Sequence, residues 1–479
     1  MTVTPFGSRS QGRHRRSAGR PGRPVDDPDE TDTDRAGTTY GGSRRTSANS
    51  GPPRERPRLS PWIAPPAPTW VGELDRHEPV APIIVDRRFG AARLLVTAGG
   101  TPIGSLELPL VDGRARAATV RHALDSQLGD VPEPAAPPAA FDAVTVVVAT
   151  RGRPESVARC VRALLDGDHP DVTVLVVDND PVDDRTAEVV RGFGDPRVRY
   201  VHEPRRGASV GRNRGLQEAD TDIVAFTDDD TEPDRAWAVR IAGAFAADPD
   251  VACVSGPVLA ARLATAEELA ADSALAWNKG FERRRFSLAE PPDDSPIFPF
   301  SPGLFGIGAN LAVRTDVARS VGGFDEALGP GSPTHGGEDC EFLVRLVLAD
   351  QVLAYEPSAW VRHHHRPGPD ALREQLHGYA IGLGGFLTKI ALDRRARAAA
   401  LRRLPAAVAQ LRRISARESG AGDGMPAGTS RNRLHGLARG PLAYLRSRRA
   451  ARRAGGRVPP LVADPPPASS GSRSLALVG

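Results

Sequence analysis

The chain has 479 residues, enough for one large domain with smaller flanking pieces. Its formal net charge is +4, and its only lysines are Lys279 and Lys389 among 63 basic residues. Together with the excess of Ala, Pro and Gly, this arginine bias indicates a GC-rich genome and is weak evidence for a nucleic-acid partner. No Gly-Lys-Ser/Thr sequence occurs, which excludes a P-loop ATPase that holds phosphate with a lysine.

The cysteines and the apolar segments bear on the cellular compartment. Cys160, Cys253 and Cys340 are far apart and lie in apolar periodic segments, which argues against a disulfide framework or a Cys-rich zinc site. Residues 1–16 lack the apolar core of a secretory signal, and no stretch of about 18 apolar residues follows. We therefore expect a cytoplasmic protein without a membrane span.

The N-terminal region divides into a tail and a small module. Residues 1–60 contain almost no large apolar residues and are expected to be a disordered tail. Short strands at 92–97 and 103–108, around a Gly-rich turn, and a helix at 117–128 predict a small α+β module. With its Pro/Ala linker this module covers residues 61–135.

Residues 141–367 predict the main domain. Short β-branched runs alternate with amphipathic helical segments, and the predicted strands are 144–149, 172–177, 198–202 and 223–227. This βαβαβαβ order predicts an α/β fold with a doubly wound, mostly parallel sheet. Ligands then bind beyond the carboxyl ends of the strands.

The C-terminal region is predicted to be a basic helical extension over residues 368–455, followed by a disordered Pro/Ser-rich tail at 456–479. The apolar stretch 379–392 precedes several arginines, a pattern compatible with an anionic membrane surface. An ordinary amphipathic packing helix explains the same pattern. Peripheral contact with the inner face of a membrane therefore stays open.

Three consecutive carboxylates, Asp228, Asp229 and Asp230, follow a buried strand and form the sharpest motif. Clustered like charges are tolerated beside a cation or in open water. Mg²⁺ or Mn²⁺ prefers such oxygen ligands and can also hold a substrate diphosphate. The alternative is an acidic turn that caps the following helix.

A second acidic pair, Glu338 and Asp339, begins a predicted helix after the Gly-rich stretch 329–337. Acidic residues at a helix N-terminus often only complement the helix dipole. The glycines are suited to a loop that closes over substrate, and a carboxylate delivered there can act as a general base. The sequence alone does not choose between these two residues.

Three histidines, His363, His364 and His365, end a predicted strand. Alternation along the strand places His363 and His365 on one face and His364 on the other. Imidazole is a good ligand for Mn²⁺-like ions, so His363 or His365 is a candidate to complete the aspartate site. A solvated histidine cluster is the alternative.

The motifs over residues 143–366 resemble family 2 glycosyltransferases with the GT-A fold, of the bacterial, soluble, non-processive type. Residues 146–155 are similar to the family's first strand and nucleotide-binding turn, with Arg151 and Gly152 in place of the usual Tyr and Asn. Residues 176–180 resemble the second-strand motif, and residues 207–215 resemble the Gly-x-x-x-Ala-Arg-Asn-x-Gly helix.

The resemblance implies roles for individual residues. The donor-binding candidates that it implies are Thr150, Arg153, Asp178, Arg212, Asp228 and Asp229. Asp228 and Asp230 fall on the family's DxD position, so the resemblance implies these two as metal ligands, beside the histidine candidates His363 and His365 named above. Asp339 falls on the family's general base, with Glu338 beside it. Residues 305–314, with Gly308, match the segment that lines the acceptor side.

The resemblance therefore implies an inverting, Mn²⁺- or Mg²⁺-assisted transfer from a nucleotide-sugar, with UDP as the expected nucleotide. The acceptor is a hydroxyl of a glycan, a lipid-linked sugar or a small molecule, in glycan, cell-wall or polysaccharide biosynthesis. Two alternatives stay open. One is a nucleotidyltransferase acting on sugar phosphates, although the first loop has no lysine. The other is a non-catalytic membrane or protein scaffold.

Overall fold

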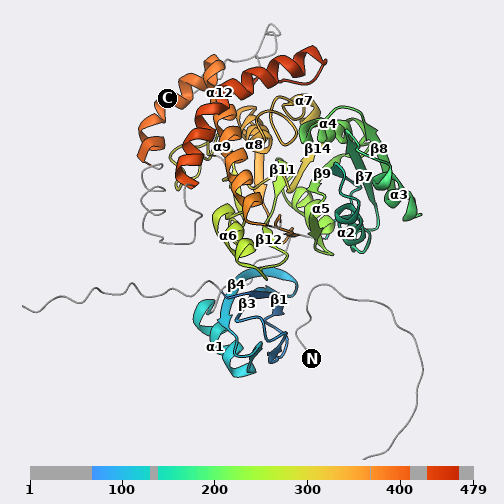
Figure 1. Cartoon of the computed structure of the whole chain (residues 1–479), viewed down its shortest axis with the longest axis vertical. Coiled ribbons are helices and arrows are strands. Elements are labelled where there is room, and N and C mark those ends of the chain that lie inside the picture. The colour runs from blue at the N-terminus through green and yellow to red at the C-terminus, as the bar shows by residue number, and fades with distance from the viewer. Residues whose placement is uncertain (1–66, 130–138, 302, 367, 410–428, 463–479) are drawn as a thin grey trace, which may run out of the picture. The chain divides into compact units, whose positions relative to one another are not determined.

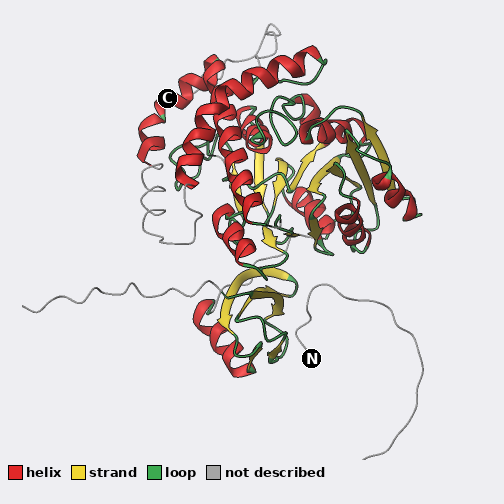
Figure 2. Cartoon of the chain, in the orientation of Figure 1, coloured by secondary structure: helices red, strands yellow, loops and turns green. Residues whose placement is uncertain are grey.

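The computed structural model describes residues 67–129, 139–301, 303–366, 368–409 and 429–462. The predicted tail at 1–60 and most of the one at 456–479 lie outside these residues. Helices and strands account for most of the described chain (Figures 1 and 2). None of the described helices combines the length and the hydropathy that a membrane span requires.

The N-terminal module contains the predicted hairpin and helix. Its elements are β1 (Thr69–Asp75), β2 (Ile83–Ile84), β3 (Ala91–Ala98), β4 (Thr101–Pro109), β5 (Arg114–Ala115) and α1 (Ala117–Gln127). β3 and β4 pair antiparallel around Gly99 and Gly100, which both have positive φ, and β1 pairs parallel to β3. The module has a hydrophobic core of its own, with Trp70, Leu94 and Leu106 at its centre.

The central sheet has eight strands in the order β13-β15-β11-β14-β9-β6-β7-β8. Their bounds are β6 (Val144–Thr150), β7 (Val172–Asn179), β8 (Val198–Glu203), β9 (Ile223–Asp228), β11 (Val251–Ser255), β13 (Arg284–Phe286), β14 (Asn310–Arg314) and β15 (Val352–Tyr355). β6 to β9 are mutually parallel, and β15 is parallel to β11. β14 runs antiparallel to both of its neighbours, and β13 is also antiparallel. The predicted α/β fold is confirmed as a mixed sheet.

Helices cover both faces of this sheet (Figure 2). One face packs against α2 (Pro154–Leu165), α3 (Arg185–Gly192) and α5 (Trp237–Ala247). The other packs against α4 (Ala208–Glu218), α7 (Thr315–Ser320) and α8 (Glu338–Leu348). Apolar residues alternate between the faces: Val147 and Phe226 belong to one cluster, and Val146 and Ala225 to the other.

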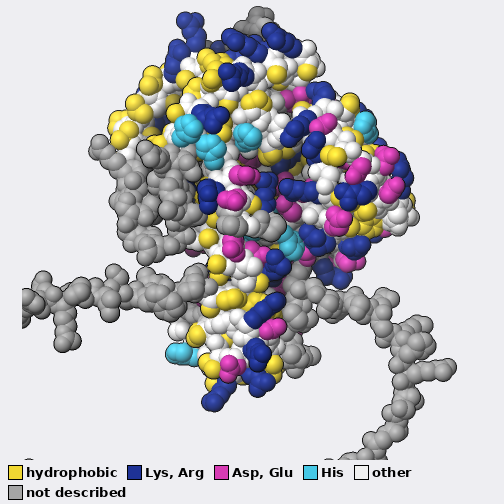
Figure 3. Space-filling view, in the orientation of Figure 1, with side chains coloured by type: hydrophobic (Ala, Val, Ile, Leu, Met, Phe, Trp, Pro, Cys, Tyr) yellow, Lys and Arg dark blue, Asp and Glu magenta, His cyan; other side chains and the backbone are white. Residues whose placement is uncertain are grey.

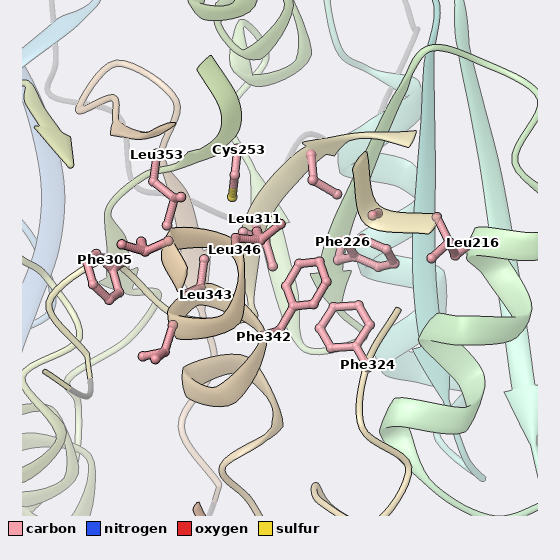
Figure 4. Packing of buried hydrophobic residues seen from close by; sticks show 14 of the residues in the cluster. Leu216, Phe226, Cys253, Phe305, Leu311, Phe324, Phe342, Leu343, Leu346 and Leu353 are labelled. Carbon is pink, nitrogen blue, oxygen red and sulfur yellow. The ribbon is translucent and has the colours of Figure 1, made fainter. Parts of the chain in front are cut away.

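Aromatic packing fixes α8 against the sheet (Figure 4). Phe324 lies edge-on to Phe226 of β9, with ring centroids 5.0 Å apart, and stacks on Phe342 of α8 at 4.4 Å. All three rings are fully buried. Because Phe342 lies one turn after Glu338, this contact brings the start of α8 to the same edge as the end of β9.

A second, small sheet contains β10 (Thr231–Pro233), β12 (Val258–Ala260) and β16 (Val361–His363), in the order β10-β16-β12. The strand predicted to end with the three histidines thus ends at His363 and lies outside the central sheet. β10 begins directly after the three aspartates, and Thr231 pairs with His363 across the antiparallel ladder.

The C-terminal helices are α9 (Pro369–Leu392), α10 (Arg394–Arg402) and α12 (Thr429–Arg453). Phe386 and Ile390 of α9 lie in the same hydrophobic cluster as the sheet residues, so α9 shares the core of the main domain. Short helix α6 (Ala266–Leu275) packs against α9 through Ala271 and Leu372.

Glycines allow α9 and α12 to lie side by side (Figure 1). A Cβ added to Gly440 would lie 2.4 Å from the Cα of Gly384, and one added to Gly436 would lie 2.8 Å from the Cβ of Ala380. The two helix backbones therefore approach too closely for larger residues at these positions. The Gly-rich spacing within α9 is explained by helix packing.

Candidate active site

The candidate site forms where parallel strands end at one edge of the central sheet. Thr150, the last residue of β6, pairs with Asp178 of β7, and Ala149 pairs with Asp228 of β9. Side chains separated by dozens of residues in the chain therefore meet, as the parallel topology predicts.

Asp229 points away from solvent and is held by the first loop. Its carboxylate accepts hydrogen bonds from the Thr150 hydroxyl at 2.6 Å and from Arg153 at 2.9 Å. Burial, with the neighbouring Asp230 carboxylate, raises the pKa of Asp229 to about 6. Thr150 and Arg153 thus hold the aspartate turn in the structure.

Asp228, Asp230 and His363 form the one group of potential metal ligands found among the described residues. One ligand atom from each lies within 4.8 Å of the others. His363 Nε2 is 3.1 Å from Asp230 Oδ1, because the pairing of β10 with β16 brings the histidine beside the aspartates. Burial alone would raise the pKa of Asp230, but His363, together with Arg153 and Arg366, outweighs it and holds the pKa well below its ordinary value. Two carboxylates and one imidazole fit a Mn²⁺- or Mg²⁺-like ion.

The other two histidines lie elsewhere. His364 contacts Glu232 at 2.5 Å. His365 lies 3.7 Å from Asp272 and stacks on Trp277, with ring centroids 5.5 Å apart. The structure therefore brings His363 to the aspartates and leaves His365 outside the group. His365 lies beyond the end of β16, and its ring centroid is 6.3 Å from that of His363.

Arg212 joins the two acidic motifs. This fully buried guanidinium donates to Asp228 at 2.8 Å and to Glu338 at 2.9 Å, and lies over the ring of Phe324. Burial alone would lower the pKa of Arg212, but the two carboxylates raise it above its ordinary value. Burial, with the charge of Asp339, raises the pKa of Glu338 to about 7. Glu338 is therefore a partner of Arg212.

Asp339 occupies a different position from Glu338. It follows Gly337, which has φ of 89°, at the first turn of α8. Its Oδ2 accepts the Gly308 N–H at 3.0 Å, and its Oδ1 accepts the Cys340 N–H at 2.7 Å. A Cβ on Gly308 would lie 3.1 Å from Asp339 Cβ and 3.3 Å from Arg212. Glycine at 308 lets the chain pass between the arginine and the half-buried carboxylate.

Asp178 lies buried at the end of β7. Its Oδ2 accepts the Tyr200 hydroxyl at 3.2 Å, whereas its Oδ1 has no hydrogen-bond partner among the described residues. Burial raises the pKa of Asp178 above its ordinary value. A buried acceptor without a donor is costly, so a ligand N–H would satisfy it.

Sequence reasoning missed two asparagines that hold the site together. Asn179 donates to the Thr150 carbonyl at 2.6 Å and accepts the Gly207 N–H at 3.0 Å, which joins β6, β7 and the start of α4. Asn213 donates to Glu326 at 3.0 Å and accepts the Phe324 N–H at 2.8 Å. Both asparagines lie inside the motifs quoted above, next to Asp178 and Arg212, and this proximity was the available signal.

The central part of the chain is similar in sequence to known glycosyltransferases. Residues 145–287 match the family model for glycosyl transferase family 2. The chain is 32% identical, over 305 residues, to a pre-mycofactocin glycosyltransferase of Mycobacterium tuberculosis, covering 59% of this chain and 58% of that protein. It is 29% identical over 233 residues to the succinoglycan biosynthesis protein ExoM of Rhizobium meliloti, covering 47% and 67%.

A solved mannosyltransferase of Pyrobaculum calidifontis, in complex with GDP-Man and Mn²⁺, matches with a TM-score of 0.41 and 19% identity, over 70% of this chain and 94% of that one. Similarity at this level indicates nothing about individual site residues. The chain spans little more than half the length of the mycobacterial relative. Residues 145–287 are therefore a region of similarity to glycosyl transferase family 2.

Proposed function

We propose that this protein transfers a sugar, with inversion, from a nucleotide-sugar to an acceptor hydroxyl. The observation that carries the proposal is the double contact of Arg212 with Asp228 and Glu338, at 2.8 and 2.9 Å. This contact joins the cluster of potential metal ligands to the start of α8, where Asp339 lies. Sugar transfer needs the diphosphate-binding groups and the base close together, because the base acts at the anomeric carbon to which the diphosphate is bonded.

The donor half of the site contains Asp178, Arg153 and Arg212. The unpartnered Oδ1 of Asp178 accepts one N–H from the nucleobase. Uracil offers a single ring N–H, which matches this one free oxygen and supports UDP over nucleotides that present two adjacent donors. The two arginines lie beside the aspartates, where they offset the charge of a bound diphosphate.

Asp228, Asp230 and His363 would hold the divalent ion, which when bound neutralises charge on the departing diphosphate. The remaining steps belong to this chain's own groups. Asp339 takes the proton of the acceptor hydroxyl as that oxygen forms a bond to the anomeric carbon. The bond from the anomeric carbon to the diphosphate breaks, and its electron pair leaves with the diphosphate. Attack opposite the leaving group inverts the configuration.

Asp339 is favoured over Glu338 as the base because of their surroundings. Glu338 is buried and bound to Arg212, so it cannot approach an acceptor without losing this ion pair. Asp339 is held by two backbone N–H groups and remains partly accessible.

Calorimetric titration of UDP and of GDP, with Mn²⁺ and then with EDTA, tests the proposal. We expect Mn²⁺-dependent UDP binding that Asp230→Ala abolishes and Asp339→Asn retains. If neither nucleotide binds under any condition, the non-catalytic scaffold becomes the better description. Turnover of a nucleoside triphosphate with a sugar phosphate would support the nucleotidyltransferase instead.

We further propose that the C-terminal helices contact an anionic lipid surface. Nine of the 13 large hydrophobic side chains exposed on the described residues lie between 379 and 445, which concentrates apolar surface there. The α12 sequence has eight arginines and no acidic residue. Figure 3 shows hydrophobic and basic side chains gathered over α12. Exposed Leu434 and Leu442 beside Arg439 and Arg446 suit the boundary between lipid headgroups and acyl chains.

Flotation of the full chain with vesicles tests this contact. We expect binding to phosphatidylglycerol-containing vesicles at low salt, no binding to pure phosphatidylcholine, and loss of binding in the Leu434→Asp/Leu442→Asp variant. Val182→Asp, which changes an exposed apolar residue far from α12 in the sequence, is the control. Equal binding by both variants and the parent chain would overturn the proposal.

A further inference from the structure

The two lysines of the chain lie in contrasting surroundings. Lys389 is buried and donates to Asp325 at 2.6 Å and to Glu341 at 2.7 Å. Lys279 donates to the backbone carbonyl of Ala276 at 2.8 Å and forms no ion pair with a carboxylate of the described residues. Lys279 therefore carries a charge that the described part of the fold does not neutralise.

Lys279 lies near Gly303, whose backbone contacts Cys340 in the first turn of α8, next to the proposed base Asp339. Its ammonium would be 3.7 Å from a Cβ added to Gly303, the residue whose backbone hydrogen-bonds Cys340. Burial lowers the pKa of Lys279, and the groups that act against this are Cys340 and Asp339. The lysine thus senses the charge of Asp339 in a partly desolvated position.

The same segment also contacts the other half of the site. The Trp277 ring lies 4.5 Å from the His363 ring, measured between centroids. The backbone N–H of Lys279 donates to the hydroxyl of buried Tyr355, which in turn donates to the Gly280 carbonyl. These contacts fix the backbone of residues 277–280 against Tyr355 and place Trp277 beside His363 of the metal-ligand group.

A cavity of about 440 Å³ opens at Lys279. It is lined by Lys279, Gly280, Phe281, Glu282, Arg284 and Asp294. Arg284 already pairs with Asp294 at 2.6 Å, so Lys279 is the cation of this lining that pairs with no carboxylate of the described chain. This volume accommodates a ligand group of about monosaccharide size.

We propose that Lys279 binds an anionic group, a carboxylate or a phosphate, on the acceptor, and so selects acidic acceptors. The inference rests on the proposed transfer reaction. The donor diphosphate does not explain Lys279, because that group belongs beside Asp228, Asp230 and His363, whereas Asp339 and Cys340 are the ionisable groups that act on the lysine. An anion in this position would orient the acceptor hydroxyl toward Asp339.

Binding of an anion can be measured without knowing the acceptor. Lysine labelled with ¹³C at Cε gives two side-chain signals in this chain, and Lys279→Gln identifies one of them. Inorganic phosphate and acetate are titrated separately into the full chain, with sodium chloride at matched ionic strength as the control. We expect a saturable shift of the Lys279 signal, with phosphate or acetate, and no shift of Lys389. The same shift with chloride, or none at all, would overturn the inference.

Transfer to matched acceptors measures the functional effect. Glucose, glucuronic acid and glucose 6-phosphate differ in charge at one position of the same sugar. For an acidic acceptor we expect Lys279→Met to raise KM roughly 10- to 100-fold, as loss of a charge-assisted hydrogen bond does, with kcat and the donor KM unchanged. Lys279→Arg should restore most of the affinity, and Arg284→Met should leave it unchanged.

The two measurements separate the possible failures. An equal rise in KM for glucose and for its acidic counterparts in Lys279→Met would overturn the selection of anions. If no nucleotide-sugar is consumed, the proposed function fails, while the titration with phosphate and acetate still decides whether Lys279 binds an anion.

Discussion

Glu338→Gln should change how the stability of the protein depends on pH. Glu338 is fully buried, bound to Arg212 and close to Asp339, and its pKa is raised to about 7 from an ordinary value of 4.5. Because the folded state holds this proton more tightly, the stabilisation is complete below pH 4.5 and is lost as the pH rises through 7. A tenfold difference in proton affinity between the folded and unfolded states corresponds to about 1.4 kcal/mol.

With this raised pKa, ionisation of Glu338 is easier in the unfolded chain than in the folded one. Relative to a group that stays protonated, it lowers the free energy of unfolding by about 1 kcal/mol at pH 5.5 and about 3 kcal/mol at pH 8. Between pH 5.5 and pH 8, the free energy of unfolding of the parent chain should therefore fall by about 2 kcal/mol more than that of Glu338→Gln. Glutamine still accepts the hydrogen bond from Arg212, so the ion pair is replaced without leaving a buried donor unpaired.

Urea unfolding followed by tryptophan fluorescence, at pH 5.5, 7 and 8, measures this difference. Glu188→Gln, a change of an exposed glutamate on α3, is the matched control and should follow the parent chain at each pH. Parallel curves for Glu338→Gln and the parent chain would refute the argument that burial of the Glu338 charge destabilises the fold.

Three further results are expected. Asp339→Asn should retain nucleotide binding and lower kcat by a factor of about 10² to 10⁴, measured by release of nucleoside diphosphate; retention of full turnover would remove Asp339 as the base. His363→Ala should weaken Mn²⁺ binding in a titration followed by electron paramagnetic resonance. His365→Ala should not weaken it, because His365 lies outside the group formed by Asp228, Asp230 and His363; equal effects of the two substitutions would contradict this placement. Gly440→Ala should destabilise the protein by about 1–3 kcal/mol through its contact with Gly384, while Gly192→Ala, with open space around its Cβ, should not; thermal unfolding compares the two.

Much of the main domain could be predicted from local pattern. The β-branched runs at β6, β7, β8 and β9 carry the signal of strands buried on both faces, and parallel pairing then brings their ends together. The positions of Asp178 and Asp228 at one edge follow from this regularity. The start of α8 at Glu338 was also predicted, because glycines precede it and an apolar periodic segment follows.

Other features depend on contacts distant in the sequence. The pairing of Thr231 with His363 joins two three-residue strands, which are too short to give a periodic signal, so proximity of His363 to Asp230 could not be derived locally. The bridge from Arg212 to Glu338 likewise depends on tertiary packing through Phe324. The glycines of α9 could be explained only once Gly384 was seen against Gly440 of α12.

The central claim is that this site activates a nucleotide-sugar with a divalent ion and Asp339. Its most direct test is release of nucleoside diphosphate from a panel of UDP- and GDP-sugars, with an acceptor pool and Mn²⁺. We predict that the parent chain consumes at least one donor, that EDTA or Asp230→Ala stops consumption, and that Asp339→Asn binds the same donor without turning it over. Consumption that is unaffected by EDTA and by both substitutions would contradict the account.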